Sequence, residues 1–361
     1  MPPDRRLERQ ATLRQALEAE GLDALLVTHL PNIRYLTGFS GSAALLVVRL
    51  DGTVLITDFR YAVQAPHEAG DSAEVEIDQR SVWERLGRVL AAMAGALGVE
   101  AHALTVRDAE RVSALTRSRV VPTGDLVERL RAVKAPEEIV AIRAAADLAQ
   151  AALAEVLPTV RVGAGEREIA ATLEGALRRR GSEWHPFPTI VASGPRAALP
   201  HARTSARPVE RGDLLLLDFG AQVDGYCADL TRTVVVGARA DERQRTIYEL
   251  VRSAQRRALE HLRAGQTGRE GDALAREVIA ARGFGDAFGH SLGHGLGLEV
   301  HEAPRLAPTT DAPLPLHAVV TVEPGIYLPG WGGVRLEDDV HLGPDGAELL
   351  SDGRTELVEL V

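Results

Sequence analysis

The sequence predicts an α+β protein of two domains, a smaller α/β domain over residues 1–132 and a larger domain over residues 133–361. Up to about residue 130, helical and strand patterns alternate, which is typical of a small α/β domain. Beyond Pro136, long helical patterns are separated by two stretches that indicate antiparallel hairpins. A chain of 361 residues is long enough for two domains with separate cores.

The elements of the first domain follow from the spacing of their apolar residues. Helices are predicted over residues 5–21 and 84–98, and Gly21 is a suitable stop for the first of them. Strands are predicted over residues 23–29, 43–50, 52–58 and 102–108.

The second domain begins where a helical pattern is interrupted at Val133–Pro136. A new helix starts after "APEE", with two acids in its first turn, where the helix dipole favours negative charge. Three further helices are predicted over residues 166–181, 241–265 and 270–283.

Composition limits the function classes. The net charge of −10 argues against nucleic acid or an anionic membrane as a partner. No apolar stretch reaches transmembrane length, and the charged N-terminus "MPPDRRLERQ" lacks the apolar core of a signal peptide. Cys227 is the single cysteine, so no internal disulfide forms, which fits a cytoplasmic protein.

The stretch "DLLLLDFGAQVDGYCADLTRT" at residues 213–233 places two acids in an apolar context. Asp224-Gly225 is a favoured hairpin turn, and equal counting outward from it places Asp218 opposite Thr231. Asp229 then points to the same face, as a diagonal neighbour of Asp218.

A second stretch, "VVTVEPGIYLPGWGGVRLEDDVH" at residues 319–341, has the same form. If its turn is centred on Trp331, Glu323 lies opposite Asp339, and Glu337 shares their face. Burial of four carboxylates costs several kcal/mol each unless something compensates their charge. One such acid is more often a strand end or an ion pair, and Arg232 and Arg335 are near enough to neutralise some charge. Two matched hairpins indicate instead a site for divalent cations with oxygen ligands.

Histidines gather in "GHSLGHGLGLEVHEAP", where His290, His294 and His301 fall within twelve residues. The intervening glycines argue against a helix, no HExxH zinc motif is present, and the glycines do not form a dinucleotide-binding GxGxxG. His201 in "GPRAALPHA" is a further candidate. Four acids with one histidine match a two-metal site better than a single zinc, and such a site activates water and polarises a carbonyl.

The order of these acids and of His294 along the chain resembles that of the metal ligands in the pita-bread metallopeptidases. The resemblance is to the proline-specific branch in particular, the prolidases (Xaa-Pro dipeptidases) and aminopeptidase P. The resemblance extends to "NIRYLTGF", "TDFRY", "RAVKAPEEI" and "PTIVASGPRAALPHA", and so spans most of the chain. It implies a pita-bread catalytic domain preceded by a creatinase-like α/β domain, and a homodimer. The metal-ligand pattern is complete, with Asp218, Asp229, His294, Glu323 and Glu337.

The resemblance also implies roles. Asp218 is expected to bind one ion and His294 the other, with Asp229 and Glu337 bridging both. Glu323 is expected to be a ligand and the general base. His290 and His301 are expected to be catalytic, by contacting the substrate carbonyl and stabilising the tetrahedral oxyanion. His201 is expected to line the substrate pocket, and Arg335 to support Glu337 and the end of the substrate. The expected metal is Mn²⁺, with Co²⁺ or Zn²⁺ as alternatives, since ligand type alone does not select one.

Two substrate classes remain open. A dipeptidase benefits from a cation facing the free carboxylate of proline, and residues 302–316 contain one arginine, Arg305. Arg34 and Arg60 are alternatives for this role. The absence of an additional N-terminal domain favours the dipeptidase, with aminopeptidase P as the alternative.

More remote alternatives are a metal-free creatinase-like hydrolase, a non-catalytic pita-bread binding protein and a methionine aminopeptidase. The intact ligand pattern argues against the first two, and the N-terminal domain argues against the third.

Overall fold

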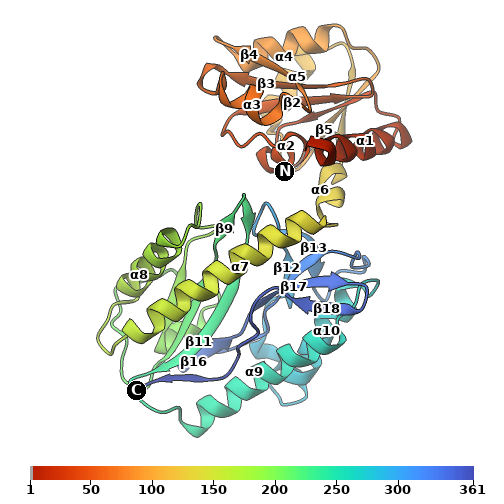
Figure 1. Cartoon of the computed structure of the whole chain (residues 1–361). Helices are drawn as coiled ribbons and strands as arrows, with labels where there is room; N and C mark the ends of the chain where they lie inside the picture. Colours follow the sequence, from red (N-terminus) through yellow and green to blue (C-terminus); the bar gives the residue numbers. More distant parts are fainter. Residues whose placement is uncertain (1–2) are drawn as a thin grey trace. The chain divides into compact units, whose positions relative to one another are not determined.

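The computed structural model describes residues 3–361, which fall into two compact units divided between Arg131 and Ala132. In the first unit, helices surround a six-stranded sheet of order β4-β3-β2-β1-β5-β6 (Figure 1). The strands are β1 (Ala24–Val27), β2 (Ala44–Arg49), β3 (Thr53–Asp58), β4 (Glu74–Asp78), β5 (Ala96–Glu100) and β6 (Arg119–Thr123). The helices are α1 (Pro3–Ala19), α2 (Leu30–Thr37), α3 (Gln64–Ala69), α4 (Val82–Ala91), α5 (Val106–Leu115) and α6 (Leu126–Arg131).

Two sequence predictions in this unit are wrong. The helix predicted to reach residue 98 ends at Ala91, because the chain turns through Gly95, which has a φ of +98°, into strand β5. The strand predicted over residues 102–108 is instead a turn that leads into α5, which begins at Val106. Thr105 caps this helix by accepting a hydrogen bond from the backbone N–H of Asp108, and such a cap favours a helix over a strand.

The second unit has two halves, each formed by a pair of helices packed on strands (Figure 1). In one half, α7 (Pro136–Val156) and α8 (Glu166–Arg179) share an apolar core with strands β7, β8 and β11. In the other, α9 (Glu242–His261) and α10 (Gly268–Ala280) pack on β14 to β17. The site described below is built from residues of both halves.

The strands of the second unit form two larger sheets. The first has the order β19-β11-β8-β7, with β7 (Ile190–Ser193), β8 (Leu214–Phe219), β11 (Leu230–Val236) and β19 (Val358–Leu360). The second has the order β13-β12-β14-β17-β18, with β12 (Gly293–Gly295), β13 (Glu302–Leu306), β14 (Val319–Val322), β17 (Asp338–Gly343) and β18 (Gly346–Leu349). Two small ladders join β9 (Gln222–Val223) to β10 (Tyr226–Cys227) and β15 (Gly325–Leu328) to β16 (Gly332–Arg335).

The first predicted hairpin is confirmed. Asp218 pairs with Thr231 across β8 and β11. Asp224 and Gly225 both have positive φ, of 50° and 80°, as the predicted two-residue turn requires.

The second hairpin exists, but its predicted register is wrong. Asp339 pairs with Thr321 and not with Glu323. The reason is a turn centred on Gly330 instead of Trp331. Pro329 and Gly330 occupy its two central positions, Gly330 has a φ of +79°, and the N–H of Trp331 donates to the carbonyl of Leu328. The shift of partner is two residues, so the face of each side chain is unchanged.

Candidate active site

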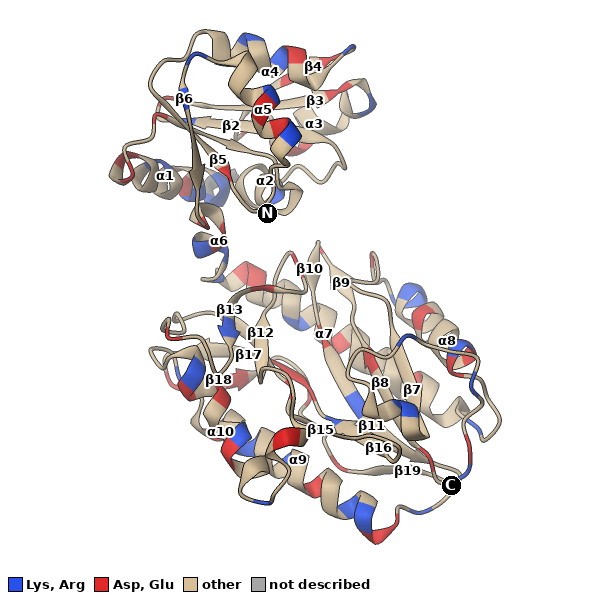
Figure 2. Ribbon diagram, turned by 180° about the vertical axis from the view of Figure 1, so that it is seen from behind, with Lys and Arg blue, Asp and Glu red and all other residues tan. Residues whose placement is uncertain are grey.

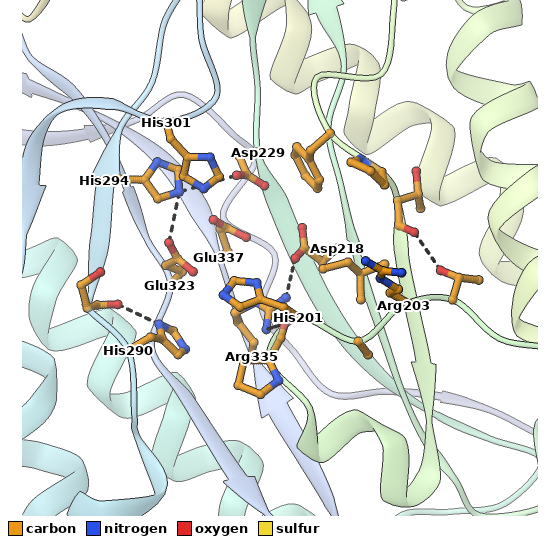
Figure 3. A pocket seen from close by; sticks show the side chains of 18 of the residues that line it. His201, Arg203, Asp218, Asp229, His290, His294, His301, Glu323, Arg335 and Glu337 are labelled. Atoms are coloured by element: carbon orange, nitrogen blue, oxygen red, sulfur yellow. Dashed lines mark hydrogen bonds and ion pairs between the residues drawn. The ribbon is translucent and has the colours of Figure 1, made fainter. Parts of the chain in front are cut away.

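A cavity of about 770 Å³ in the second unit brings the predicted site residues together. This volume is suitable for a small-molecule substrate. Ten of the residues that the sequence marked line it, and they are His201, Asp218, Asp229, His290, His294, His301, Arg305, Glu323, Arg335 and Glu337. Figure 3 shows His294, His301 and Glu323 on one side of the cavity and Asp218 on the other.

Three of the four acids lie where a strand ladder is interrupted. Asp229 separates β10 from β11, Glu323 follows β14, and Glu337 separates β16 from β17, whereas Asp218 lies within β8. The two sheets meet at a bridge in which the N–H of Glu337 donates to the carbonyl of Thr231 at 3.1 Å. This bridge brings the acids of the two hairpins together although about 100 residues separate them in sequence.

The carboxylates and one imidazole are close enough to share cations. Asp229, His294 and Glu337 each offer a ligand atom, and these atoms lie within 4.8 Å of one another. Nε2 of His294 lies 3.3 Å from Oε1 of Glu323 and 3.8 Å from Oδ2 of Asp229. Within residues 3–361, the buried Oδ1 atoms of Asp218 and Asp229 have no hydrogen-bond partner. Unsatisfied buried oxygens of this kind fit a site for divalent metal ions.

The charge of the acids is poorly compensated by the protein. Burial raises the pKa of Asp229 and Glu337 well above the ordinary range, and neighbouring carboxylates raise both further. Burial also raises the pKa of Glu323 to about 8. Arg232, one of the two candidate counter-charges, pairs instead with the buried Asp338 at 2.7 Å. Arg335 contacts a single one of the four acids, Asp218.

His294 has the geometry of a metal ligand. Its Nδ1 lies 3.1 Å from the carbonyl oxygen of Gly295, which fixes the proton on Nδ1 and leaves the lone pair of Nε2 directed at the acids. Burial, followed by the proximity of His301, lowers the pKa of His294 to about 4, so the imidazole is neutral. A neutral imidazole is the form that binds metals.

The other histidines differ in their availability to a substrate. Both ring nitrogens of His290 have protein partners at 2.8 Å, Nδ1 the carbonyl of Ser291 and Nε2 the hydroxyl of Tyr327. The ring of His301 packs 4.3 Å from that of His294 and is exposed to the cavity. His301 is therefore the better placed of the two to meet a substrate.

Several supporting residues were not found from the sequence. The hydroxyl of Thr231 donates to Glu337 at 2.6 Å, and that of Thr321 donates to Glu323 at 3.1 Å. Asp339 accepts from the backbone N–H of Asp229 at 3.1 Å, and Tyr327 links His290 to Arg335. Each of these bonds fixes the orientation of a predicted site residue. Thr231 and Asp339 had a usable signal, as the predicted cross-strand partners of Asp218 and Glu323.

The segment that carries His201 is held by Glu166, a carboxylate with no exposed surface. Glu166 accepts hydrogen bonds from the backbone and hydroxyl of Ser193, from the backbone and hydroxyl of Ser205 and from Nε of Arg196. This network fixes residues 193–205 against α8. Arg34 and Arg60, the alternative carboxylate-binding residues, belong to the first unit, where Arg60 pairs with Asp58 at 2.7 Å.

Comparison with known proteins decides the family. Residues 140–344 match metallopeptidase family M24, and residues 9–133 match the creatinase/prolidase N-terminal domain. The chain belongs to metallopeptidase family M24. It is therefore an enzyme, and the predicted creatinase-like domain and pita-bread catalytic domain are confirmed.

Among the relatives of this M24 peptidase are enzymes named for Xaa-Pro substrates, and the similarity extends over nearly the full length of both chains. A Xaa-Pro dipeptidase from Pyrococcus furiosus is 35% identical over 97% of this chain and 99% of its own. The structure of a Xaa-Pro dipeptidase from Bacillus anthracis matches with a TM-score of 0.94 and 39% identity, over 98% of this chain and all of the other. An X-Pro aminopeptidase from Thermotoga maritima matches with a TM-score of 0.89 and 37% identity, over 97% and 99%.

Proposed function

We propose that this M24 peptidase hydrolyses the bond between an N-terminal residue and proline, with Xaa-Pro dipeptides as its preferred substrates. The similarity to Xaa-Pro dipeptidases supports this reaction. The observation that carries the dipeptide preference is Arg305. It lies opposite His294 across β12 and β13, its side chain is exposed to the cavity, and within residues 3–361 its guanidinium has no hydrogen bond or ion pair. A free guanidinium there suits the carboxylate of the substrate proline.

Asp218, Asp229, His294, Glu323 and Glu337 would hold two divalent ions, and three of them, Asp229, His294 and Glu337, offer ligand atoms within 4.8 Å of one another. Mn²⁺ is the proposed metal, since the ligands are mainly oxygen with one imidazole, and Co²⁺ or Zn²⁺ are alternatives. When bound, the two ions make a water molecule more acidic and polarise the scissile carbonyl.

The side chains of the chain itself position the substrate and move the protons. Glu323 accepts a proton from the attacking water molecule while the oxygen of that water bonds to the carbonyl carbon of the substrate. The same proton passes to the proline nitrogen as the C–N bond breaks, so that the amino acid and proline leave. His301 donates a hydrogen bond to the carbonyl oxygen. His290 and Tyr327 support Arg335, and His201 lines the wall beside Asp218. The prolyl nitrogen carries no N–H, so this site needs no acceptor for one.

The remaining features of the proposal concern the setting. A homodimer is proposed from the resemblance to prolidases, and the cytoplasm from the single thiol, Cys227, which is free and buried. No nucleic acid is proposed as a partner, because the net charge is −10 and Figure 2 shows acidic and basic residues interspersed along α8, α9 and α10. Within residues 3–361, no helix is both long and apolar enough to cross a bilayer.

The preference is tested by comparing hydrolysis of Ala-Pro and Ala-Pro-Ala-Ala by the Mn²⁺-loaded enzyme. The proposal predicts that kcat/KM is at least tenfold higher for the dipeptide and that Arg305→Gln reduces this preference by raising KM for Ala-Pro. The similarity to the T. maritima aminopeptidase favours a second candidate, an Xaa-Pro aminopeptidase. Equal or faster cleavage of the tetrapeptide would establish that candidate instead.

A further inference from the structure

The cavity contains a second arginine whose charge is not used by the protein. Arg203 lines the same cavity as the acids, and its side chain is exposed. Within residues 3–361, its guanidinium forms no hydrogen bond or ion pair. Arg335, by contrast, is buried and bonded to Asp218 and Tyr327. A free guanidinium in a cavity that binds charged substrates is available to recognise an anionic group.

The backbone that carries Arg203 is firmly held. The hydroxyl of the next residue, Thr204, donates to the carbonyl of Thr189 at 2.8 Å and accepts from the N–H of Val191 at 3.2 Å. The carbonyl of Arg203 itself accepts from the guanidinium of Arg196. Arg203 is thus presented from a fixed point beside strand β7, with only its side chain free to move.

The two free guanidinium groups lie toward different ends of the metal-ligand set. Arg305 lies opposite His294 across β12 and β13. Figure 3 shows Arg203 on the Asp218 side of the cavity, away from His294 and His301. A dipeptide has its carboxylate at one end and its ammonium group and N-terminal side chain at the other. If Arg305 binds the carboxylate, the ammonium group and the first side chain lie toward Asp218 and Arg203.

The wall on this side combines apolar surface with the unused charge of Arg203. Phe187 and Ile190 line the cavity together with Arg203, and Ile190 pairs with Asp218 across β7 and β8. Methylene groups of a substrate side chain can pack on this surface, and a carboxylate at the end of the side chain can accept two hydrogen bonds from a guanidinium.

We propose that Arg203 binds the side-chain carboxylate of an acidic N-terminal residue, so that the enzyme prefers Asp-Pro and Glu-Pro to their amide counterparts. This inference rests on the proposed function. The metal ligands and Arg305 act on groups that every Xaa-Pro dipeptide shares, so they do not distinguish one N-terminal residue from another. Arg203 extends the proposed function because it would select dipeptides with an acidic N-terminal residue.

The test compares kcat/KM for Glu-Pro, Gln-Pro and Ala-Pro in the wild type and in Arg203→Gln. Glu-Pro and Gln-Pro have nearly the same shape, so their ratio isolates the charge. The wild type is expected to favour Glu-Pro over Gln-Pro by about fivefold, as a partly exposed ion pair allows. In Arg203→Gln this ratio falls to about 1, while hydrolysis of Ala-Pro stays within about twofold. Arg203→Glu is expected to reverse the preference and favour Lys-Pro.

Arg167→Gln is the matched control, because Arg167 is an exposed residue of α8 outside the cavity, and its ratio should equal that of the wild type. A wild-type ratio near 1, or a ratio unchanged in Arg203→Gln, overturns the inference. An equal loss for all three dipeptides also overturns it, because Arg203 would then bind the shared proline carboxylate. If the wild type cleaves no dipeptide, Ala-Pro included, the proposed function itself fails, and the inference fails with it.

Discussion

Arg335 binds one oxygen of Asp218 and leaves the other free. Its Nη2 lies 2.5 Å from Oδ2 of Asp218, whereas Oδ1 is buried and has no hydrogen-bond partner within residues 3–361. The two residues are 117 positions apart in sequence. One carboxylate thus has an oxygen oriented by the protein and an oxygen available to a metal ion, which is the arrangement expected of an oriented ligand.

Loss of the hydrogen bonds that the Arg335 guanidinium donates should impair catalysis more than folding. Arg335→Lys keeps the positive charge but cannot donate to Asp218, Thr231 and Tyr327 together, as the guanidinium does. We expect kcat for Ala-Pro to fall at least tenfold, with a smaller loss of thermal stability. Arg335→Met should cost about 3–5 kcal/mol of unfolding free energy in metal-stripped protein, because it leaves a buried charge unpaired. Wild-type kinetics in Arg335→Lys would contradict the proposed orienting role.

Removal of one carboxylate should stabilise the metal-stripped protein while it abolishes activity. Burial and the neighbours Glu323 and Asp218 raise the pKa of Glu337 well above its ordinary value, so folding at pH 8 is opposed by this group. Glu337→Gln keeps the acceptor for Thr231 and removes the charge. We expect about 1–3 kcal/mol higher unfolding free energy in metal-stripped protein and no proline release.

The matched control for this variant is Glu348→Gln. Glu348 is an exposed acid whose pKa is lowered by its hydrogen bond to His341, so its loss should give no stabilisation. A Glu337→Gln variant that is less stable than the wild type without metal would show that the carboxylate cluster is not under repulsion.

The stability of the metal-stripped protein should decrease as the pH rises. The pKa of Glu323 is raised by burial to about 8, above its value near 4.5 in the unfolded chain. The folded state therefore holds a proton that the unfolded state has lost, and this contribution disappears as the pH rises through 8. Between pH 6.5 and 8 we expect a loss of about 2 kcal/mol, or about 4–8 °C in Tm.

Most of the contribution of His290 to the pH dependence lies below this window, because burial lowers its pKa to about 4 from the ordinary value of 6.5. Glu323→Gln should remove much of the dependence, and saturating Mn²⁺ should also reduce it, because metal ions bind the deprotonated ligands. Thermal scans across this window measure the effect. If the Tm of metal-stripped protein instead rises with pH, the pKa of Glu323 is not raised in the folded state, and the prediction is contradicted.

Glu166 should affect the substrate side of the site without contacting it. Burial acts to raise the pKa of Glu166, but its hydrogen bonds from Ser205 and Ser193 outweigh this effect and lower it. Glu166→Gln weakens the network that holds residues 193–205, and we expect KM for Ala-Pro to rise several-fold with little change in metal content. Metal analysis beside steady-state kinetics distinguishes this result from a general loss of folding, which would lower both.

The clustering of the four carboxylates was largely predictable from the sequence because these acids lie on two hairpins with local turn signals. Asp224-Gly225 fixed the pairing of Asp218 with Thr231 by short-range geometry. The predicted register of the second hairpin was displaced by two residues because the turn depends on which of several adjacent glycines adopts the required positive φ. Only Gly330 occupies the required position in the structure.

The supporting residues could not be predicted in the same way. Thr231 and Glu337 are 106 residues apart, and the bond between them exists only because two sheets meet at that point. The same applies to Lys134 in "RAVKAPEEI", which pairs with Glu302 at 2.7 Å with both side chains buried. Contacts between distant segments depend on tertiary packing, which the local sequence pattern does not contain.

The central claim, that two metal ions held by this cavity enable cleavage of Xaa-Pro bonds, is tested most directly by one titration. Mn²⁺ is added to metal-stripped wild type at a protein concentration at which it binds stoichiometrically, while proline release from Ala-Pro is followed, with Asp229→Asn as control. The account predicts no release without metal, a maximum near two ions per chain, and no release by Asp229→Asn. Full activity in the presence of excess chelator, or in Asp229→Asn, would contradict it.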